Sequence, residues 1–387
     1  MQVQGTTVFH HEFSGDAWLG GTHYFNNLRS VTERFHPEIE VKGLNLNACP
    51  TIYTKLSDRI RMSWYNRVIG KVPPAMKDAG RENYLRSIAP GRTICIYSTN
   101  YKHLLPFPRL PKVLWIPDFQ IFHLPEFFKP EDIEERKLSY SKGGKLARLV
   151  VLSSEAAQKD LVRFFPELAS KSRVLHFVTE LPDSVFTSNP NYVNPKYRLP
   201  EKYFYVPNQY WKHKNHKLIV EAVDILAKQQ TPVHVVFSGS QSDPRNPEWF
   251  SELQAMIEAN HLRNYITELG IIPKEDVYAL MRQSCALINV SRFEGWSTSV
   301  EESKAIGKRI ILSDIPVHIE QAPMHGYYTG TDDAVQLAKY MTKLWTDTNS
   351  GPDERDELNA RNKTAADLRI FAENFAMVIN EACERTK

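Results

Sequence analysis

The sequence predicts an α/β protein built from two doubly wound domains with parallel sheets. Short apolar segments rich in β-branched residues alternate with segments of helical spacing along almost the whole chain. This alternation indicates parallel strands joined by helices that cover both faces of a sheet. It stops once, over residues 179–203, where four prolines and three asparagines occur without periodicity. We therefore expect two domains, joined by this segment as a linker or crossing loop, with a cleft between them.

Each half of the chain contains its own series of apolar segments with the length of buried strands. In the first half they are 41–46, 93–99, 113–118, 148–154 and 173–178. In the second half they are 202–208, 233–239, 265–272, 285–291 and 309–314. Each of the second series precedes a turn and a segment with helical spacing. In 216–229, for example, an apolar stripe is made by Leu218, Ile219, Ala222, Val223 and Leu226.

We place the first domain at residues 1–185 and the second at 186–364, with a C-terminal helix over about 365–387 that packs back on the first. A polar loop, 346–354, precedes this long helix. Ligands of such sheets bind beyond the carboxyl ends of the strands. Functional residues are therefore expected in the loops that follow the strands.

Composition and charge exclude several classes of function. The chain is 42% hydrophobic and 24% charged, as in an ordinary soluble protein, and its net charge of +3 argues against a general nucleic-acid binder. No signal peptide and no membrane-spanning segment is expected, because no apolar run has the required length. The four dispersed cysteines predict neither a metal site nor a disulfide framework. We expect a cytoplasmic protein, with a peripheral position at the cytoplasmic membrane face.

The membrane expectation depends on an uneven distribution of charge. Between Lys55 and Lys102 the chain has ten basic residues and three acidic ones. This excess attracts anionic lipid headgroups or an acidic acceptor. The alternative is a solvated helical face.

The stretch SRFEGWSTSVEES, residues 291–303, places Glu294 and Glu302 around a small polar turn after a predicted strand. One interpretation is a capping box, formed by Ser299 with Glu302 or by Thr298 with Glu301. Capping contributes about 1 kcal/mol and accounts for Glu302, but it leaves Glu294 without a role.

The other interpretation of this stretch is a ligand site. Gly295 allows the backbone to approach a ligand closely. The first N–H groups of a helix bind phosphate, helped by the helix dipole. Glu294 and Glu302 would then accept hydrogen bonds from sugar hydroxyls on either side of a diphosphate. Spacing alone leaves both interpretations open.

Residues 293–321, FEGWSTSVEESKAIGKRIILSDIPVHIEQ, resemble the signature of the retaining glycosyltransferases of family GT4. The GT-B fold of that family has two Rossmann-like domains. Its two glutamates, with seven residues between them, match Glu294 and Glu302, and its S-D-x-P-x-H-x-E turn matches 313–320. The resemblance implies that Glu294 contacts the donor sugar and Glu302 the ribose of the nucleotide. It also implies a diphosphate site at the backbone of Gly295, Trp296, Ser297 and Thr298.

A second stretch, VPNQYWKHKNHKLIVEA at 206–222, resembles the first loop of the family's C-terminal domain. There an Arg and, five residues on, a Lys bind the diphosphate. Lys214 matches the Lys, whereas Gln209 stands in the position of the Arg, and Lys212 is the expected substitute. The alternative is a basic helix start that faces solvent.

Shorter stretches resemble other parts of the family's site. Asp118, in WIPDFQ, is expected to orient the acceptor hydroxyl or the sugar, or else to cap a loop. The remaining matches are Gly20 and Gly21 near the donor phosphates, Gly239 after a strand, and Ile271 and Ile272 at the base.

These resemblances imply a retaining hexosyltransferase that moves a sugar from a nucleotide-diphosphate sugar to an acceptor hydroxyl, in the biosynthesis of O-antigen, capsule or exopolysaccharide. The expected partners are the donor, a sugar or lipid-linked glycan acceptor and an anionic membrane surface. No cofactor, metal or nucleic acid is expected. Alternatives are a nucleotide-sugar epimerase or phosphorylase of the same layout. A third alternative is a catalytically degenerate protein that only binds nucleotide sugars. It is favoured by Gln209, which stands in the position of the diphosphate-binding arginine.

Overall fold

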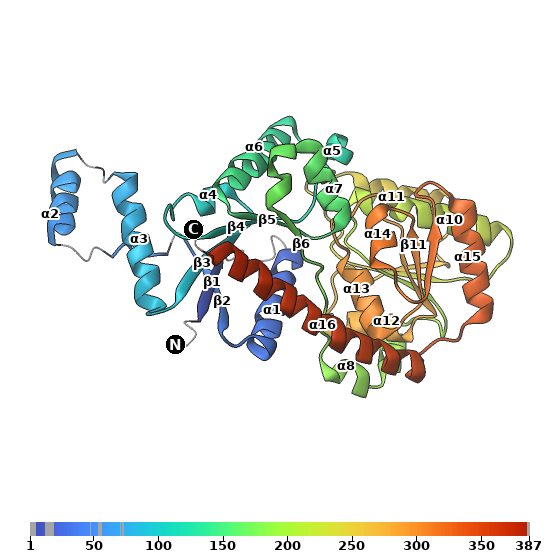
Figure 1. Ribbon diagram of the computed structural model, residues 1–387. Helices are drawn as coiled ribbons and strands as arrows, with labels where there is room; N and C mark the ends of the chain where they lie inside the picture. The colour runs from blue at the N-terminus through green and yellow to red at the C-terminus, as the bar shows by residue number, and fades with distance from the viewer. Residues whose placement is uncertain are drawn as a thin grey trace. The chain divides into compact units, whose positions relative to one another are not determined.

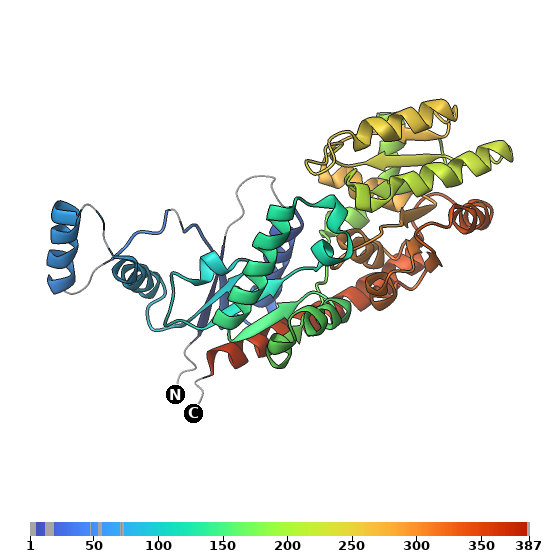
Figure 2. The same cartoon turned by 90° about the horizontal axis from the view of Figure 1, so that it is seen from above.

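The computed structural model describes residues 5–11, 19–46, 48–52, 56–69, 71 and 73–384. The chain forms two units. Unit 1 comprises Met1–Phe119, Pro130–Phe177 and Leu368–Lys387, and unit 2 comprises Gln120–Lys129 and Val178–Asp367. Each contains a six-stranded sheet with helices packed on both faces (Figures 1 and 2). The predicted fold class, two doubly wound α/β domains, is confirmed.

The sheet of unit 1 has the strand order β2-β1-β3-β4-β5-β6, and all neighbouring strands are parallel. The strands are β1 (Thr6–His11), β2 (Ile39–Leu44), β3 (Thr93–Ser98), β4 (Lys112–Ile116), β5 (Leu149–Leu152) and β6 (Ser172–Val174). Their nearly continuous apolar sequences suit strands that are covered on both faces. The helices are α1 (Leu19–Phe35), α2 (Leu56–Trp64), α3 (Pro74–Ile88), α4 (Tyr101–Leu104), α6 (Pro130–Leu146) and α7 (Glu155–Phe164), with the π-helical η2 (Tyr65–Ile69) and the 3-10 helix η4 (Pro166–Lys171).

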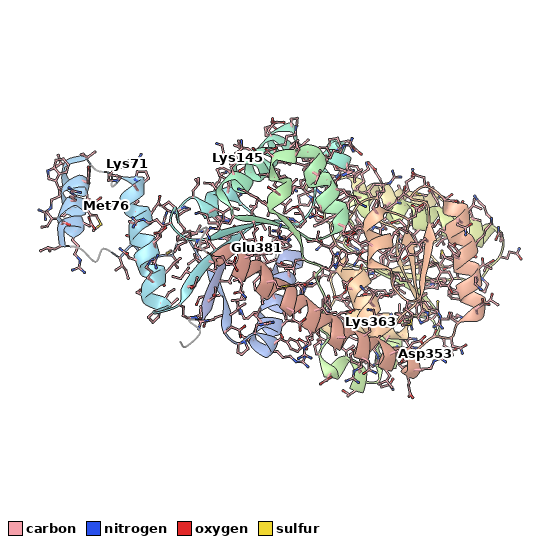
Figure 3. The ribbon with its side chains drawn as sticks, in the orientation of Figure 1. Lys71, Met76, Lys145, Asp353, Lys363 and Glu381 are labelled. Atoms are coloured by element: carbon pink, nitrogen blue, oxygen red, sulfur yellow. The ribbon has the colours of Figure 1, made fainter. Side chains whose placement is uncertain are left out.

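Aromatic side chains join these elements into the core of unit 1. Tyr24 of α1 stacks on Trp115 of β4 at 3.8 Å between ring centroids, and its hydroxyl lies 2.7 Å from that of Tyr97. The end of the long helix α16 (Glu354–Cys383) contributes Phe375, whose ring lies 5.9 Å from that of Tyr97. Glu381, which Figure 3 labels, lies further along α16. It accepts a hydrogen bond from Arg173 Nε at 2.9 Å.

The sheet of unit 2 has the order β12-β11-β10-β7-β8-β9 and is also parallel throughout. The strands are β7 (Phe204–Pro207), β8 (Val235–Ser238), β9 (Ile266–Glu268), β10 (Ala286–Asn289), β11 (Ile310–Ser313) and β12 (Gly326–Thr329). The longer helices are α10 (His216–Lys228), α11 (Trp249–Ala259), α12 (Lys274–Gln283), α13 (Thr298–Ile306) and α15 (Ala334–Asp347). The short ones are α5 (Gln120–His123), η3 (Pro125–Phe127), α8 (Asp183–Thr187), η5 (Pro190–Tyr192), α9 (Val193–Tyr197), η6 (Lys212–Lys214) and α14 (Pro316–Gln321).

The proline-rich segment 179–203 is not an irregular linker, so this part of the prediction is wrong. It contains α8, η5 and α9, and Arg198 ends α9 in the left-handed conformation, with φ of 54°. Asp276 of α12 accepts hydrogen bonds from Tyr192 at 2.8 Å and from Lys196 and Tyr197. These polar contacts fix the segment against α12 within unit 2, and they have no periodicity that a sequence pattern would reveal.

Candidate active site

Glu294 and Lys214 form a buried ion pair in unit 2. Glu294 lies in the loop between β10 and α13, and Lys214 is the last residue of η6. Lys214 Nζ donates to Glu294 Oε1 at 2.6 Å, and the two side chains are only 15% and 9% exposed. Burial opposes the ionisation of Glu294, but the adjacent charge of Lys214 outweighs it, so the pKa of the carboxyl lies below its ordinary value. The structure thus brings together the two residues that the resemblance made most important.

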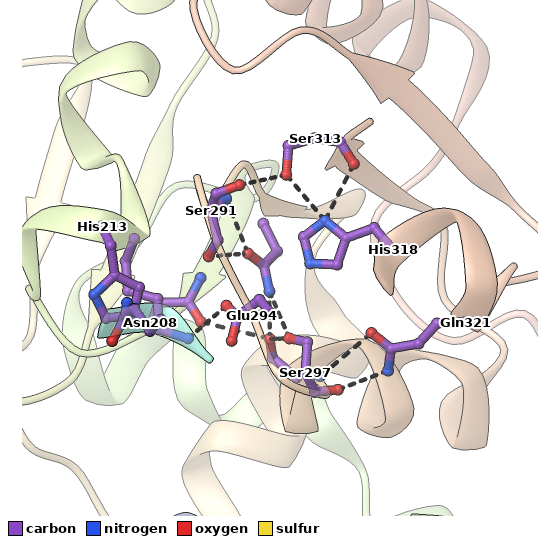
Figure 4. Close-up of polar contacts among 12 residues, drawn as sticks. Asn208, His213, Ser291, Glu294, Ser297, Ser313, His318 and Gln321 are labelled. Atoms are coloured by element: carbon purple, nitrogen blue, oxygen red, sulfur yellow. Dashed lines mark hydrogen bonds and ion pairs between the residues drawn. The ribbon is translucent and has the colours of Figure 1, made fainter. Parts of the chain in front are cut away.

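His318 of α14 is fully buried beside this loop (Figure 4). Its Nδ1 lies 3.0 Å from Ser313 Oγ and 3.1 Å from Ser313 O. Since the carbonyl can only accept, Nδ1 carries the proton and the lone pair is on Nε2. Burial lowers the pKa of His318 to about 4, so the ring is neutral. Nε2 has no hydrogen-bond partner among the described residues, which leaves a buried acceptor for a ligand.

An asparagine, and not a capping box, organises the start of α13. Asn289 Nδ2 donates to Ser297 Oγ at 2.8 Å and to Ser299 Oγ at 2.9 Å (Figure 4). Ser297 is the N-cap, and its side chain makes no hydrogen bond to the helix. Glu302 is engaged elsewhere, by Lys274. Glu301 accepts hydrogen bonds from Lys304 and Gln321, both at 2.9 Å. Both predicted capping boxes are therefore wrong, because neither Ser299 nor Thr298 is the N-cap and both glutamates have other partners.

One backbone amide expected at the diphosphate is engaged within the protein. The N–H of Ser297 donates to Gln321 Oε1 at 3.3 Å, and Gln321 Nε2 donates back to Ser297 O at 3.0 Å. The first N–H groups inside a helix have no intrahelical partner. The donors that this geometry offers an anion therefore begin at Thr298, whereas Gly295 and Trp296 lie half-buried in the loop before it.

Glu302 also has a lysine partner, which sequence reasoning missed. Lys274, the first residue of α12, places Nζ 2.5 Å from Glu302 Oε1, and Glu302 is only 5% exposed. The same Nζ lies 4.8 Å from the centroid of the Tyr278 ring. Lys274 follows closely on Ile271, which is 81% exposed, and Ile272, which packs against an apolar cluster of unit 2. Ile271, Lys274 and Tyr278 therefore belong to one short stretch, which contacts Glu302 of α13 through Lys274.

The loops after β7 and β8 come close together next to α13. Gly239, after β8, has φ of 141°, and a Cβ there would lie 2.5 Å from Asn208 O. Asn208 is buried, and its Oδ1 accepts a hydrogen bond from Ser299 Oγ at 3.4 Å. Its Nδ2 has no partner among the described residues. A buried donor is thus available beside the half-buried Gln209.

Two further cations lie near Lys214: Lys212 is close to it in the chain, and Arg245 contacts its neighbour His213. Lys212 places Nζ 5.2 Å from the centroid of the Trp249 ring. Arg245, in the loop before α11, has its guanidinium about equally far from two rings, 5.0 Å from Trp211 and 5.1 Å from Phe128. The guanidinium also contacts Asp243 Oδ1 at 3.2 Å, Gln120 Oε1 at 3.2 Å and His213 Nδ1 at 3.3 Å. Sequence reasoning missed Arg245, because its loop has no motif that points to it.

Three predicted residues belong to unit 1. Gly20 is exposed and Gly21 buried in the first turn of α1, and residues 12–18 before them lie outside the described residues. Asp118 follows β4, and its backbone O accepts a hydrogen bond from Tyr140 Oη at 3.2 Å. Their roles at the site stay a prediction.

The described residues contain no group of three or more His, Cys, Asp and Glu side chains suited to a metal ion. A cavity of about 170 Å³ lies at the carboxyl end of α13, lined among others by Ser303, Gly307, Met324 and Asp356. It includes none of the predicted site residues.

Residues 194–365 match the family described as glycosyl transferases group 1. The match includes Lys214, Glu294 and Glu302. The chain is a nucleotide-sugar-dependent glycosyltransferase of this family, GT4. Among curated proteins, none matches the sequence.

The whole glycosyltransferase chain is similar in fold to several solved structures. HepE of Anabaena, in complex with UDP and glucose, has 15% sequence identity and a TM-score of 0.68, with 97% of this chain and 99% of that chain covered. Sucrose-phosphate synthase of Thermosynechococcus elongatus has 13% identity and a TM-score of 0.65, with 98% and 99% covered. WaaG, a glycosyltransferase involved in lipopolysaccharide biosynthesis, has 13% identity and a TM-score of 0.58, with 97% and 98% covered. At these identities the likeness concerns the fold, which is GT-B.

Proposed function

We propose that this glycosyltransferase moves a hexose from a uridine-diphosphate sugar to an acceptor hydroxyl, with retention of the anomeric configuration. The observation that carries the proposal is the buried pair of Glu294 and Lys214 next to the amino end of α13. The choice of uridine diphosphate is supported by HepE, which shares the fold and whose structures contain UDP or UDP-glucose.

The chemical demand on such a site is greatest at the leaving diphosphate. As the bond between the anomeric carbon and the phosphate oxygen breaks, negative charge accumulates on that oxygen. Lys214 and the N–H groups from Thr298 onward would stabilise this charge more strongly than they stabilise the ground state. The acceptor oxygen bonds to the anomeric carbon on the same face, and its proton goes to the departing phosphate oxygen.

The donor sugar would be held by acceptors and a donor that lie beside the Glu294 and Lys214 pair. Glu294 is ionised and accepts hydrogen bonds, and His318 Nε2 is a second acceptor without a partner among the described residues. Asn208 Nδ2 is a buried donor that also has no partner among the described residues. A hexose has several hydroxyls that both donate and accept, so it satisfies such a mixed set.

Glu302 would bind the ribose hydroxyls of the nucleotide, with Lys274 keeping the carboxylate charged and in position. Gln209 in the place of an arginine leaves the diphosphate with one cation fewer. Arg245 is the better candidate to replace it, because its guanidinium contacts His213, the neighbour of Lys214. Lys212 instead lies over the ring of Trp249.

We infer that the acceptor is a sugar or a lipid-linked glycan of a cell-surface polysaccharide, and that transfer takes place at the cytoplasmic face of a membrane. This is supported by the basic composition of residues 55–102. Asp118, Gly20 and Gly21 of unit 1 are proposed to contribute to donor or acceptor binding.

The experiment compares two carboxylate variants. Glu302→Ala should raise the Kd for UDP about tenfold or more in calorimetry, because ribose contacts are lost. Glu294→Ala should leave that Kd nearly unchanged and lower kcat, because the lost contact is to the sugar. Glu252→Ala, at an exposed position of α11, is the matched control. The assignment fails if both site variants behave like this control in chains that still fold.

Product analysis separates the alternatives. With a UDP-sugar and no acceptor, an epimerase forms a new sugar isomer, whereas a glycosyltransferase gives at most slow hydrolysis. A protein that binds UDP-sugars and turns over none of them, with any acceptor of a glycan panel, would be the degenerate binding protein that Gln209 favours.

A further inference from the structure

Helix α2 and the adjoining η2 expose apolar side chains that a folded domain would ordinarily cover. Neither element contains a buried residue. The exposed large apolar side chains are Leu56 at 70%, Ile60 at 61%, Trp64 at 52%, Val68 at 63% and Ile69 at 55%. Several large apolar side chains exposed within one short segment indicate an interaction site.

The apolar residues of α2 form a stripe on one side of the helix. Leu56, Ile60 and Trp64 follow one another at four-residue steps, which places them on the same face. The half-buried residues Asp58 and Met62 lie on the opposite face. The helix therefore turns a partly covered side toward the chain and its apolar stripe toward solvent, whereas a helix that packs on a core buries its apolar stripe.

Positive charge flanks this stripe. At about 100° per residue, Arg59 and Arg61 lie on either side of Ile60. Both are exposed, as are Arg67 of η2 and Lys71. An apolar stripe with arginines along its edges is the pattern of a helix that lies in the plane of a membrane interface, where the guanidinium groups reach the lipid phosphates.

We propose that α2 and η2 dock this protein on a membrane that contains anionic lipids. The apolar stripe would enter the boundary between headgroups and acyl chains, and Arg59, Arg61, Arg67 and Lys71 would bind the headgroups. None of the helices in the described part of the chain has the length and apolarity needed to cross a bilayer. A second copy is a less suitable occupant, because a symmetric contact would bring the same arginines face to face.

The inference rests on the membrane position that the proposed function includes, and it names the element that makes the contact. It is tested without sugar transfer, by sedimentation of the full chain with lipid vesicles. The protein should bind vesicles of phosphatidylcholine with phosphatidylglycerol, and only weakly those of phosphatidylcholine alone. High salt should release part of the bound protein, because it screens the arginines. Equal binding to both vesicle types, or binding to neither, would overturn the inference.

Two double variants locate the contact. Ile60→Ser with Trp64→Ser removes the centre of the apolar stripe and should lower binding at least tenfold. Arg61→Gln with Arg67→Gln removes two headgroup contacts and should lower binding to anionic vesicles roughly 30-fold. Because these side chains are exposed, the thermal unfolding of the variants should match that of the parent protein. Ile370→Ser, at a position of α16 that is 53% exposed, is the control for the loss of a surface apolar group.

Two other outcomes would contradict the proposal. Variants of α2 that bind vesicles as the parent does would exclude this helix as the docking element. A dimer in light scattering that Ile60→Ser with Trp64→Ser dissociates would show that a second copy covers the stripe, and would overturn the membrane assignment. Transfer to a water-soluble acceptor should be the same in all variants, so a failure of the proposed chemistry is recognised separately.

Discussion

Replacing Lys214 by Met tests whether one cation keeps Glu294 ionised in its buried position. The Nζ lies 2.6 Å from Glu294 Oε1, and the pair is largely shielded from solvent. Met retains much of the volume of Lys but carries no charge. Glu294 would then remain as a buried carboxylate beside the neutral ring of His318.

The expected loss of stability follows from the burial of the pair. Removing one partner of a buried ion pair costs roughly 3–5 kcal/mol. Lys214 keeps some exposure, so the lower end, about 3 kcal/mol, applies. In a domain the size of unit 2, each kcal/mol lowers Tm by roughly 2–4 °C. Lys214→Met should therefore lower the transition of unit 2 by roughly 6–12 °C.

The decisive assay is a double-mutant cycle followed by thermal unfolding. Adding Glu294→Gln to Lys214→Met removes the unpaired charge, so the double variant should regain about 1–2 kcal/mol of the loss. Lys217→Met, which breaks an exposed pair with Glu221, is the control and should change Tm by about 1 °C or less. If Lys214→Met and the double variant unfold at the same temperature, the pair is not coupled and the reasoning is refuted.

Three further changes test other parts of the site. Lys274→Met should lower Tm less than Lys214→Met does, because Lys274 is 41% exposed and water screens its pair with Glu302; a larger fall would show that Glu302 depends on it for folding. Gly239→Ala should destabilise unit 2 by roughly 1–3 kcal/mol in urea unfolding, since its Cβ would collide with Asn208 O; an unchanged midpoint would contradict the close approach. The pKa of His318 is about 4 in the folded protein and 6.5 in the unfolded chain. Its contribution to the free energy of unfolding is therefore complete above pH 6.5. That contribution falls by roughly 3 kcal/mol as the pH falls toward 4. His318→Gln should flatten the stability profile over that range, and a profile of unchanged slope would show that the ring is not buried in its neutral form.

The fold could be predicted because its signals are local. The stripe of α10 and the apolar runs of the strands depend on neighbouring residues alone, and a strand followed by a helix constrains the topology. β12 was missed, because Gly326–Thr329 is a short edge strand whose two central tyrosines do not stand out as a buried run. Segment 179–203 was misjudged because polar contacts with Asp276 fix it, and such contacts have no period.

The candidate site was predictable only in part, for a related reason. Glu294 and Lys214 carry a motif, and the structure brings them together. Lys274 and Arg245 carry none. Lys274 follows a proline at the start of α12, a position at which many helices have a charged residue, and only its distance to Glu302 shows that it matters. Contacts between distant segments cannot be read from one sequence without a motif that fixes both ends.

The start of α13 shows why its serines do not cap it. A serine N-cap ordinarily stabilises a helix by about 1 kcal/mol, through a hydrogen bond to a free N–H group. Here Asn289 donates to the hydroxyls of both Ser297 and Ser299, and the N-cap makes no such bond. The chain forgoes this local stabilisation at a helix end that faces the buried Glu294 and Lys214 pair. Departures from local preference are expected where function requires them, and N–H groups that are left to an anionic ligand would be such a requirement.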